Sequence, residues 1–167
     1  MITREATPGD AAVIARIYNE GIAGRTATFE PEPRAPADVL AWFDGRHPIV
    51  VVEDRGAVIG FAGTSTYRPR SCYDGVAEFS VYVSPSERGR GAGKLAMAAL
   101  VDAAASVGFW KLVSRVFVEN ASSRRLLASI GFREVGIYER HGRLDGRWRD
   151  TVIVERLIGP AAEPPAG

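Results

Sequence analysis

The first quarter of the chain places its apolar residues at the spacing of a helix. They lie at positions 13, 14, 17, 18 and 22 and follow Thr7-Pro-Gly-Asp, a typical helix start because proline is tolerated in the first turn. Residues 30–36 carry three prolines and interrupt this pattern. Residues 38–43 predict a second, short helix. We therefore expect two helices before the first strand.

From residue 49 the pattern changes to runs of β-branched and aromatic residues, which favour strands. Strands are predicted at residues 49–53, 57–67, 76–83, 111–118, 132–141 and 148–157, and helices from the glycine-rich stretch to about residue 107 and at residues 120–130. The turns at Asp54-Arg-Gly and Asp145-Gly predict antiparallel hairpins, whereas the strand-helix-strand portion in the centre predicts a parallel pair. The fold class is therefore α/β (α+β), with a mixed sheet and helices on its faces.

Size and charge exclude several classes of protein. A chain of 167 residues with 46% hydrophobic and 25% charged residues predicts one globular domain over residues 1–158, followed by a disordered tail over residues 159–167. The net charge of +1 gives no reason to expect nucleic acid or a membrane as partner. No stretch has the apolar core of a signal peptide or the length of a membrane span, and Cys72 is the only cysteine. We expect a cytoplasmic protein.

The stretch SPSERGRGAGKLAMAAL places Gly89, Gly91 and Gly93 at the entrance of a predicted helix. Each glycine weakens a helix by about 1 kcal/mol relative to alanine, so a compensating role is expected. Free amides at a helix start bind anions such as phosphate. The patterns GxxxxGK[ST] and GxGxxG both fail here, whereas [QR]xxGx[GA] is met by Arg88, Gly91 and Gly93. The alternative is a flexible connection that binds nothing.

The matching pattern is the pyrophosphate-binding signature of the GNAT superfamily of N-acetyltransferases. The chain also resembles the phosphinothricin N-acetyltransferase branch of that superfamily in the segments IYNEGIAGRTATFE, TYRPRSCYDGVAEFSVYV, VENASSRRLLASIGF and GRWRDTVIVE, and the resemblance covers nearly all of residues 2–158. It implies a three-layer fold with a mixed, mostly antiparallel sheet between helices. It also implies that an amine attacks acetyl-CoA directly, without an acyl-enzyme.

The resemblance also implies a binding site for acetyl-CoA. Its residues are Val81, Tyr82, Val83, Arg88, Gly89, Arg90, Gly91, Ala92, Gly93, Lys94, Asn120 and Ser122. The glycine amides would hold the pyrophosphate with help from the basic side chains, and an exposed strand edge would pair with the pantetheine arm. An amide of that edge would stabilise the oxyanion. Asn120 is equally well explained as the N-cap of the helix that follows it.

The acceptor site is expected around Glu78. Alternation places Ala77, Phe79, Val81 and Val83 on one face of the strand and Glu78, Ser80 and Tyr82 on the other. Glu78 matches the proposed catalytic glutamate of the family, which would take a proton from the amine. The resemblance places Arg70 and Tyr73 against the substrate, with Phe29 and Glu30 lining the pocket, and arginine suits a carboxylate or phosphinate. The alternatives are a solvated carboxylate and a loop of surface arginines.

The general acid is not assigned by this sequence. Leu127 stands where relatives have a tyrosine or histidine that protonates the leaving thiolate, and Arg149 stands where some have histidine. A water, Tyr138 or His141 is left for this step, or the thiolate leaves unaided. His47, His141 and Cys72 show no metal-ligand spacing, and we expect neither a metal nor a Cys-His nucleophile.

The resemblance therefore predicts acetylation of the α-amino group of a small acidic amino-acid analogue. Phosphinothricin, methionine sulfoximine and arsinothricin are the candidates, which implies resistance by detoxification. It also implies a homodimer, with Trp148 at the subunit contact. Two alternatives stay open: another acceptor, such as a peptide N-terminus or a polyamine, and a non-catalytic module that binds acyl-CoA.

Overall fold

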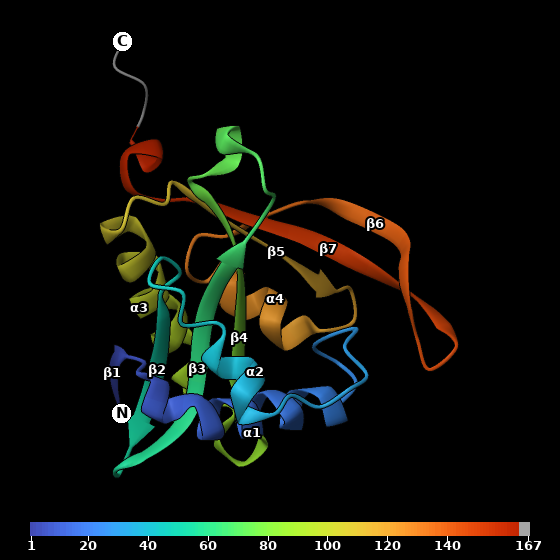
Figure 1. Ribbon diagram of the computed structural model, residues 1–167. Coiled ribbons are helices and arrows are strands. Elements are labelled where there is room, and N and C mark those ends of the chain that lie inside the picture. The colour runs from blue at the N-terminus through green and yellow to red at the C-terminus, as the bar shows by residue number, and fades with distance from the viewer. Residues whose placement is uncertain (164–167) are drawn as a thin grey trace.

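The computed structural model describes residues 1–163, and these are built around one sheet of seven strands (Figure 1). The strands are β1 (Ile2–Glu5), β2 (Ile49–Asp54), β3 (Ala57–Thr66), β4 (Val76–Val83), β5 (Lys111–Phe117), β6 (Arg133–Leu144) and β7 (Arg147–Leu157). The helices are α1 (Ala11–Ala23), α2 (Pro36–Leu40), α3 (Ala92–Ser106) and α4 (Ala121–Ala128). The strand order is β1-β2-β3-β4-β5-β7-β6, and only β4 and β5 run parallel. The predicted mixed, mostly antiparallel sheet is confirmed.

Two predictions of local structure differ from the fold. β1 has no counterpart in the sequence prediction, because a four-residue edge strand with mostly exposed side chains carries no hydrophobic alternation. Helix α2 begins at Pro36, where the missing N–H costs nothing, and ends at Leu40, earlier than predicted. Trp42 and Phe43 come after its end and still pack against the core under α1. Apolar residues that do not continue a helix produced the late predicted boundary.

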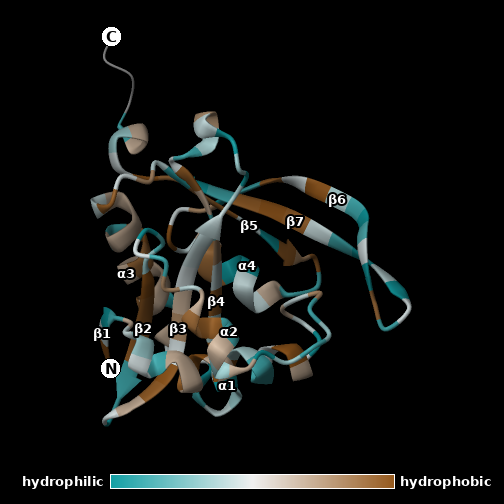
Figure 2. Ribbon diagram, viewed as in Figure 1, coloured by the Kyte–Doolittle hydropathy of each residue, from teal (hydrophilic) through white to brown (hydrophobic). Residues whose placement is uncertain are grey.

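Each face of the sheet carries its own hydrophobic core. On one face Met97 and Leu100 of α3 and Leu127 of α4 pack against Phe79 and Leu112 of the strands. On the other face Ile14, Ile17 and Tyr18 of α1 pack against Phe61 and Tyr82. Figure 2 shows the hydrophobic colour on the inner strands and the hydrophilic colour toward the tip of the β6–β7 hairpin. The three-layer arrangement and the predicted alternation of β4 are both confirmed.

Strands β4 and β5 pair over a short length only. Their register runs from Val76↔Lys111 to Glu78↔Val113 and then stops. β4 nevertheless stays paired with β3 as far as Val83, and β5 stays paired with β7 as far as Phe117. The two strands therefore diverge beyond Glu78 and open the sheet at its only parallel junction among the described residues.

The β6–β7 hairpin reaches past the rest of the sheet (Figure 1). Its register shifts between Tyr138 and Gly142, which marks a bulge in β6. After β7 the chain forms a 3-10 turn at Gly159–Ala162, inside the segment predicted as a tail, whereas residues 164–167 lie outside the described part. Within residues 1–163, none of the helices combines the length and the apolar character that a membrane crossing requires.

Candidate active site

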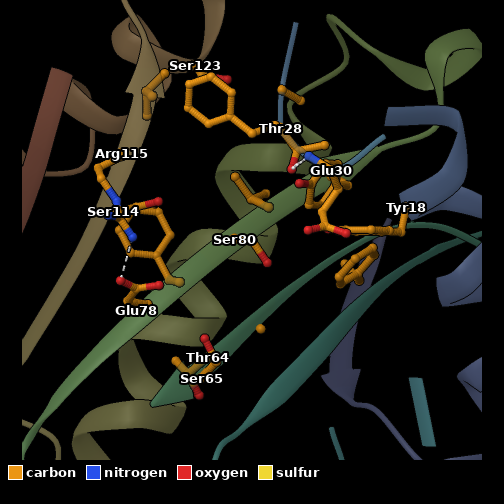
Figure 3. A pocket seen from close by; sticks show the side chains of 18 of the residues that line it. Tyr18, Thr28, Glu30, Thr64, Ser65, Glu78, Ser80, Ser114, Arg115 and Ser123 are labelled. Carbon is orange, nitrogen blue, oxygen red and sulfur yellow. Dashed lines mark hydrogen bonds and ion pairs between the residues drawn. The ribbon is translucent and has the colours of Figure 1, made fainter. Parts of the chain in front are cut away.

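The divergence of β4 and β5 opens into a cavity of about 790 Å³. Residues 79–82 of β4 and residues 114–117 of β5 line its two sides, and the loop after α1 closes it with Thr28, Phe29 and Glu30. Figure 3 shows Glu78 and Arg115 together at one end and Tyr18, Thr28 and Glu30 at the other. The cavity combines an open strand edge with charged side chains, which suits a small polar ligand.

An ion pair between Glu78 and Arg115 forms one end of this cavity. The guanidinium Nη2 donates to Glu78 Oε1 over 2.8 Å, and Arg115 Nη1 lies 3.4 Å from His141 Nε2. The side chains of Glu78 and Arg115 are 32% and 44% exposed, so both are accessible from the cavity. Glu78 Oε2 accepts no hydrogen bond from the described residues and faces any bound ligand as a free acceptor.

The bulge in β6 brings His141 to this cluster. Arg140 has a φ of 49°, and its amide donates to Asp150 Oδ1 over 2.7 Å, so the carboxylate of β7 holds the bulged backbone. The imidazole of His141 then stacks on Tyr138 with ring centroids 4.6 Å apart and lines the cavity. Phe29 lies so close to Gly142 that a Cβ there would meet its ring at 2.7 Å. The bulge therefore aims a side chain into the site, as bulges near active sites commonly do.

The opposite end of the cavity is aromatic. Tyr18 and Tyr82 meet edge to face at 4.9 Å, and Phe29 meets Phe117 in the same way at 4.8 Å. Burial raises the pKa of the Tyr82 hydroxyl, which therefore stays protonated at neutral pH. This end offers apolar surface and neutral hydroxyls, whereas the other end offers charge.

Asn120 connects the start of α4 to the loop that closes the cavity. Its Oδ1 accepts from the amide of Ser123 over 3.2 Å and from the hydroxyl of Ser122 over 3.1 Å, which confirms the N-cap. Its Nδ2 donates to the carbonyl of Thr26 over 3.1 Å. One side chain therefore caps a helix and anchors the segment that carries Thr28, Phe29 and Glu30.

The glycine-rich stretch leaves the start of α3 without a protein cap. Gly89 and Gly91 have φ values of 76° and 89°, a backbone region that favours glycine. No amide from Gly89 to Lys94 donates to an acceptor in residues 1–163. Gly93 has a different role, since a Cβ there would meet Leu126 of α4 at 2.7 Å. Two glycines shape the loop, and the third allows α3 and α4 to pack closely.

The basic residues Arg88, Arg90 and Lys94 differ in whether acidic side chains neutralise their charge. Arg90 pairs with Glu87 and, over 2.7 Å, with Asp54, so its charge is already neutralised. Arg90 was expected to add positive charge to the loop, and in the structure it shares that charge with these two carboxylates. Arg88 Nε donates to the carbonyl of Val83 over 3.3 Å, and Lys94 has no ion pair in the described part of the chain.

Several residues singled out from the sequence line the cavity, and others do not. Among the lining residues are Phe29, Glu30, Glu78, Val81, Tyr82 and Asn120. Arg70 is not among them; it precedes a 3-10 turn at Ser71–Tyr73, and Tyr73 lines a separate cavity of about 60 Å³ with Arg68. The arginine in the main cavity is Arg115. The sheet pairing places Arg115 beside Glu78, and Arg70 as a substrate contact stays a prediction.

His47 lines both cavities from the segment after α2. Its Nδ1 lies 2.5 Å from Asp44 Oδ2, and its own amide donates to Asp44 Oδ1. Burial acts to raise the pKa of the Asp44 carboxyl, but the hydrogen bonds from His47 and Arg46 outweigh it and lower that pKa to about 2. Asp44 therefore holds His47 as a fixed wall of the cavity.

The position of Leu127 agrees with the sequence argument. Its side chain is 2% exposed, lines the cavity and belongs to the core under α4. Of the two side chains named as proton donors, His141 lines the cavity, whereas Tyr138 is not among its lining residues.

Arg115 is the residue that sequence reasoning missed. A signal was present, because an arginine interrupts the apolar strand KLVSRVFV. Paired residues of parallel strands lie on the same face, so Val113 shares a face with Glu78, and Arg115 follows two residues later. Thr151 of β7 was also missed; it is 2% exposed, and its hydroxyl has no partner in the described residues.

Comparisons with known proteins agree on one family. Residues 16–132 match the Acetyltransferase (GNAT) family. The chain is 33% identical to an L-methionine sulfoximine/L-methionine sulfone acetyltransferase of Pseudomonas paraeruginosa, over 97% of each chain. It is 34% identical to a GNAT superfamily phosphinothricin acetyltransferase of Sinorhizobium meliloti solved in complex with AcCoA, with a TM-score of 0.88 over 99% of this chain and 94% of that one. It is 28% identical to a ribosomal-protein-alanine N-acetyltransferase of Brucella melitensis, with a TM-score of 0.89 over 95% and 100%.

Proposed function

Because the chain belongs to the Acetyltransferase (GNAT) family, and is therefore an acetyl-CoA-dependent N-acetyltransferase, we propose that it acetylates the α-amino group of a small acidic amino-acid analogue. Phosphinothricin, methionine sulfoximine and arsinothricin are the proposed substrates, and resistance by detoxification in the cytoplasm is the proposed role. The names of the relatives from Pseudomonas paraeruginosa and Sinorhizobium meliloti support the first two substrates.

The observation that carries this proposal is the opening between β4 and β5 with Glu78 at its edge. A thioester and an amine must meet in one place, and this cavity offers both an unpaired strand edge and a carboxylate on β4. The unpaired edge of β4, around Val81 to Val83, is suited to the peptide-like pantetheine arm. The bare amides from Gly89 to Lys94 are suited to the pyrophosphate. Ser122 and Asn120 complete the proposed site at the start of α4.

The proposed reaction is a direct transfer. The neutral amine attacks the thioester carbonyl and forms a C–N bond, an amide N–H of the β4 edge stabilises the oxyanion, and the C–S bond then breaks. An α-amine has a pKa near 8, so it needs a base, and Glu78 accepts its proton directly or through a water. The leaving thiolate takes a proton from water or from His141, since Leu127 carries none.

The test follows thiol release from acetyl-CoA with the three analogues and with glutamate as a control substrate. We expect turnover with at least one analogue and little with glutamate. Glu78→Gln keeps the shape of the side chain and removes its basicity, so kcat is expected to fall by about 10²- to 10⁴-fold. Glu134→Gln is the matched control, because Glu134 pairs with Arg124 outside the cavity. An unchanged kcat in Glu78→Gln would remove Glu78 from the proposed mechanism.

A peptide N-terminus is the second candidate acceptor, because the structural relative from Brucella melitensis is named for a ribosomal protein. Turnover of an alanine-terminated peptide without turnover of the analogues would establish it.

We also propose a homodimer formed through the outer hairpin. Val135, Ile137 and Tyr138 of β6 and Trp148 of β7 expose between 46% and 59% of their surface, and β6 is the sheet edge that no other strand covers in the described residues. Light scattering on the purified protein tests this proposal, and a monomeric mass would reject it.

A further inference from the structure

One charged pair in the cavity has the layout of a binding site for two opposite charges. Arg115 and Glu78 present a cation and an anion side by side, joined by a single hydrogen bond of 2.8 Å and both partly exposed to the same cavity. A free α-amino acid carries its ammonium and its carboxylate on one carbon atom, with the same charges in reverse. The ligand head and the protein pair are therefore complementary in charge.

We infer that the Glu78–Arg115 pair is a receptor for the zwitterionic head of a free α-amino acid. The amino group binds Glu78 and the carboxylate binds Arg115 in exchange for the hydrogen bond between the two side chains. This inference rests on the proposed function and narrows its substrate class to acceptors with a free α-carboxylate. A peptide N-terminus has an amide carbonyl at that position, and a polyamine has nothing there.

The surroundings of Arg115 support this assignment. In the main cavity it is the only arginine among the lining residues, and the arginines of the segment after β3 line no part of it. His141 contacts the other nitrogen of the guanidinium and holds the fork across the opening. A guanidinium forms paired, charge-assisted hydrogen bonds to a carboxylate and loses little freedom in doing so. Arg115 can therefore release Glu78 without losing a charged partner.

The exchange also has a consequence for catalysis. Without an acceptor, Glu78 Oε1 is occupied by the guanidinium. A carboxylate that takes Arg115 frees this oxygen for the amine. Both carboxylate oxygens of Glu78 are then available to the amine only when an acceptor with the correct head is bound. The same pair would thereby select the substrate and prepare the base.

The test compares L-methionine sulfone with its α-carboxamide, which keeps the amine and the side chain and removes only the negative charge. We expect kcat/KM of the unaltered protein to be about 10- to 100-fold higher for the acid, since hydrogen bonds to charged groups are worth that much. Arg115→Met is expected to lose this preference: kcat/KM falls 10- to 100-fold for the acid and changes less than threefold for the carboxamide. Arg115→Lys restores part of the preference.

Arg133→Met is the matched control, because Arg133 also pairs with a carboxylate, Glu155, but on the exposed face of β6. It is expected to leave the preference unchanged. Equal loss for both substrates in Arg115→Met, or equal kcat/KM for both in the unaltered protein, would overturn the inference and leave the proposed function intact.

If the protein turns over no amino acid, a binding measurement still tests the inference separately from the proposed function. Calorimetry with N-acetyl-L-methionine sulfone and its carboxamide, on the unaltered protein and on Arg115→Met, needs no catalysis. A preference for the acid that Arg115→Met removes would support the inference while the proposed function fails. Equal binding of both compounds would overturn the inference as well.

Discussion

Helices α3 and α4 follow the two strands that diverge, and they differ in whether a side chain accepts hydrogen bonds from their first backbone amides. At the start of α4 the side chain of Asn120 accepts from the amide of Ser123. At the start of α3 no side chain caps the helix, and the amides from Gly89 to Lys94 have no acceptor in residues 1–163. Both helices pack into the same core, so burial does not explain the difference.

The 3-10 turn at Pro8–Asp10, which leads into α1, is also closed by a side chain. Asp10 Oδ2 accepts from the amide and the hydroxyl of Thr7, and Arg4 pairs with the same carboxylate over 2.8 Å. This chain therefore completes the start of α4 and the turn before α1 with its own side chains and leaves the start of α3 open. An uncapped helix start loses stability unless a ligand supplies the acceptor. The comparison supports the proposal that the start of α3 binds the pyrophosphate of acetyl-CoA.

Among variants of the helix starts, the largest expected effect comes from Gly91→Ala. Gly91 has a φ of 89° and no atom within 4 Å of an added Cβ, so alanine meets only backbone strain of about 1–2 kcal/mol. Relief of this strain turns the amides of the loop, and acetyl-CoA is expected to bind about 10- to 100-fold more weakly by calorimetry. Gly146→Ala is the control, because Gly146 has a φ of 74° and equal space at the hairpin tip. Unchanged affinity in Gly91→Ala would refute the open start as the pyrophosphate site.

Asp10→Asn removes the carboxylate that pairs with Arg4 and closes the 3-10 turn before α1. Hydrogen bonds from Arg4 lower the pKa of Asp10 from 3.8 to about 2. A carboxyl whose pKa is lower in the folded state stabilises the protein above pH 4, and this contribution disappears as the pH falls from 4 toward 2. We expect Asp10→Asn to lose about 1–2 kcal/mol of the free energy of unfolding at pH 7.

Urea unfolding at pH 7 and at pH 3 measures both parts of this prediction. The difference between the variant and the unaltered protein should shrink at the lower pH, while acetyl-CoA affinity at pH 7 stays the same. A difference that does not depend on pH would show that the charge of Asp10 is not what stabilises this turn.

The smallest effects are expected from substitutions of Asn120, which caps α4 and anchors the loop after α1. Asn120→Ala removes the cap and the link to Thr26, so unfolding should require about 1 kcal/mol less. Asn120→Asp keeps the acceptor for Ser123 but loses the donor to Thr26. It should retain the stability and raise KM for the acceptor severalfold, because the loop with Phe29 and Glu30 is no longer anchored. Thermal unfolding and initial rates, measured side by side, separate the two roles, and equal behaviour of the two variants would contradict the separation.

The sequence predicted the elements better than it predicted the site. Periodicity identified four helices and six of the seven strands, because each of those strands carries a hydrophobic pattern of its own. β1 was missed because an exposed edge strand is held by backbone pairing with β2. Glu78 and the glycine loop were found through a local motif and an alternation of period two. Arg70 was expected against the substrate from a resemblance, and it is not among the residues that line the cavity.

By itself the sequence determined what depends on near neighbours: the order of the elements, the alternation of β4, the glycines with positive φ at the start of α3 and the N-cap at Asn120. The tertiary structure decided what depends on residues far apart in the chain. Glu78 and Arg115 are 37 residues apart, Asn120 and Thr26 are 94 apart, and Arg90 and Asp54 are 36 apart. Their contacts arise from the crossover that makes β4 and β5 parallel and from the point where that pairing stops. No local pattern encodes that point, because it is set by how both strands pair with their other neighbours.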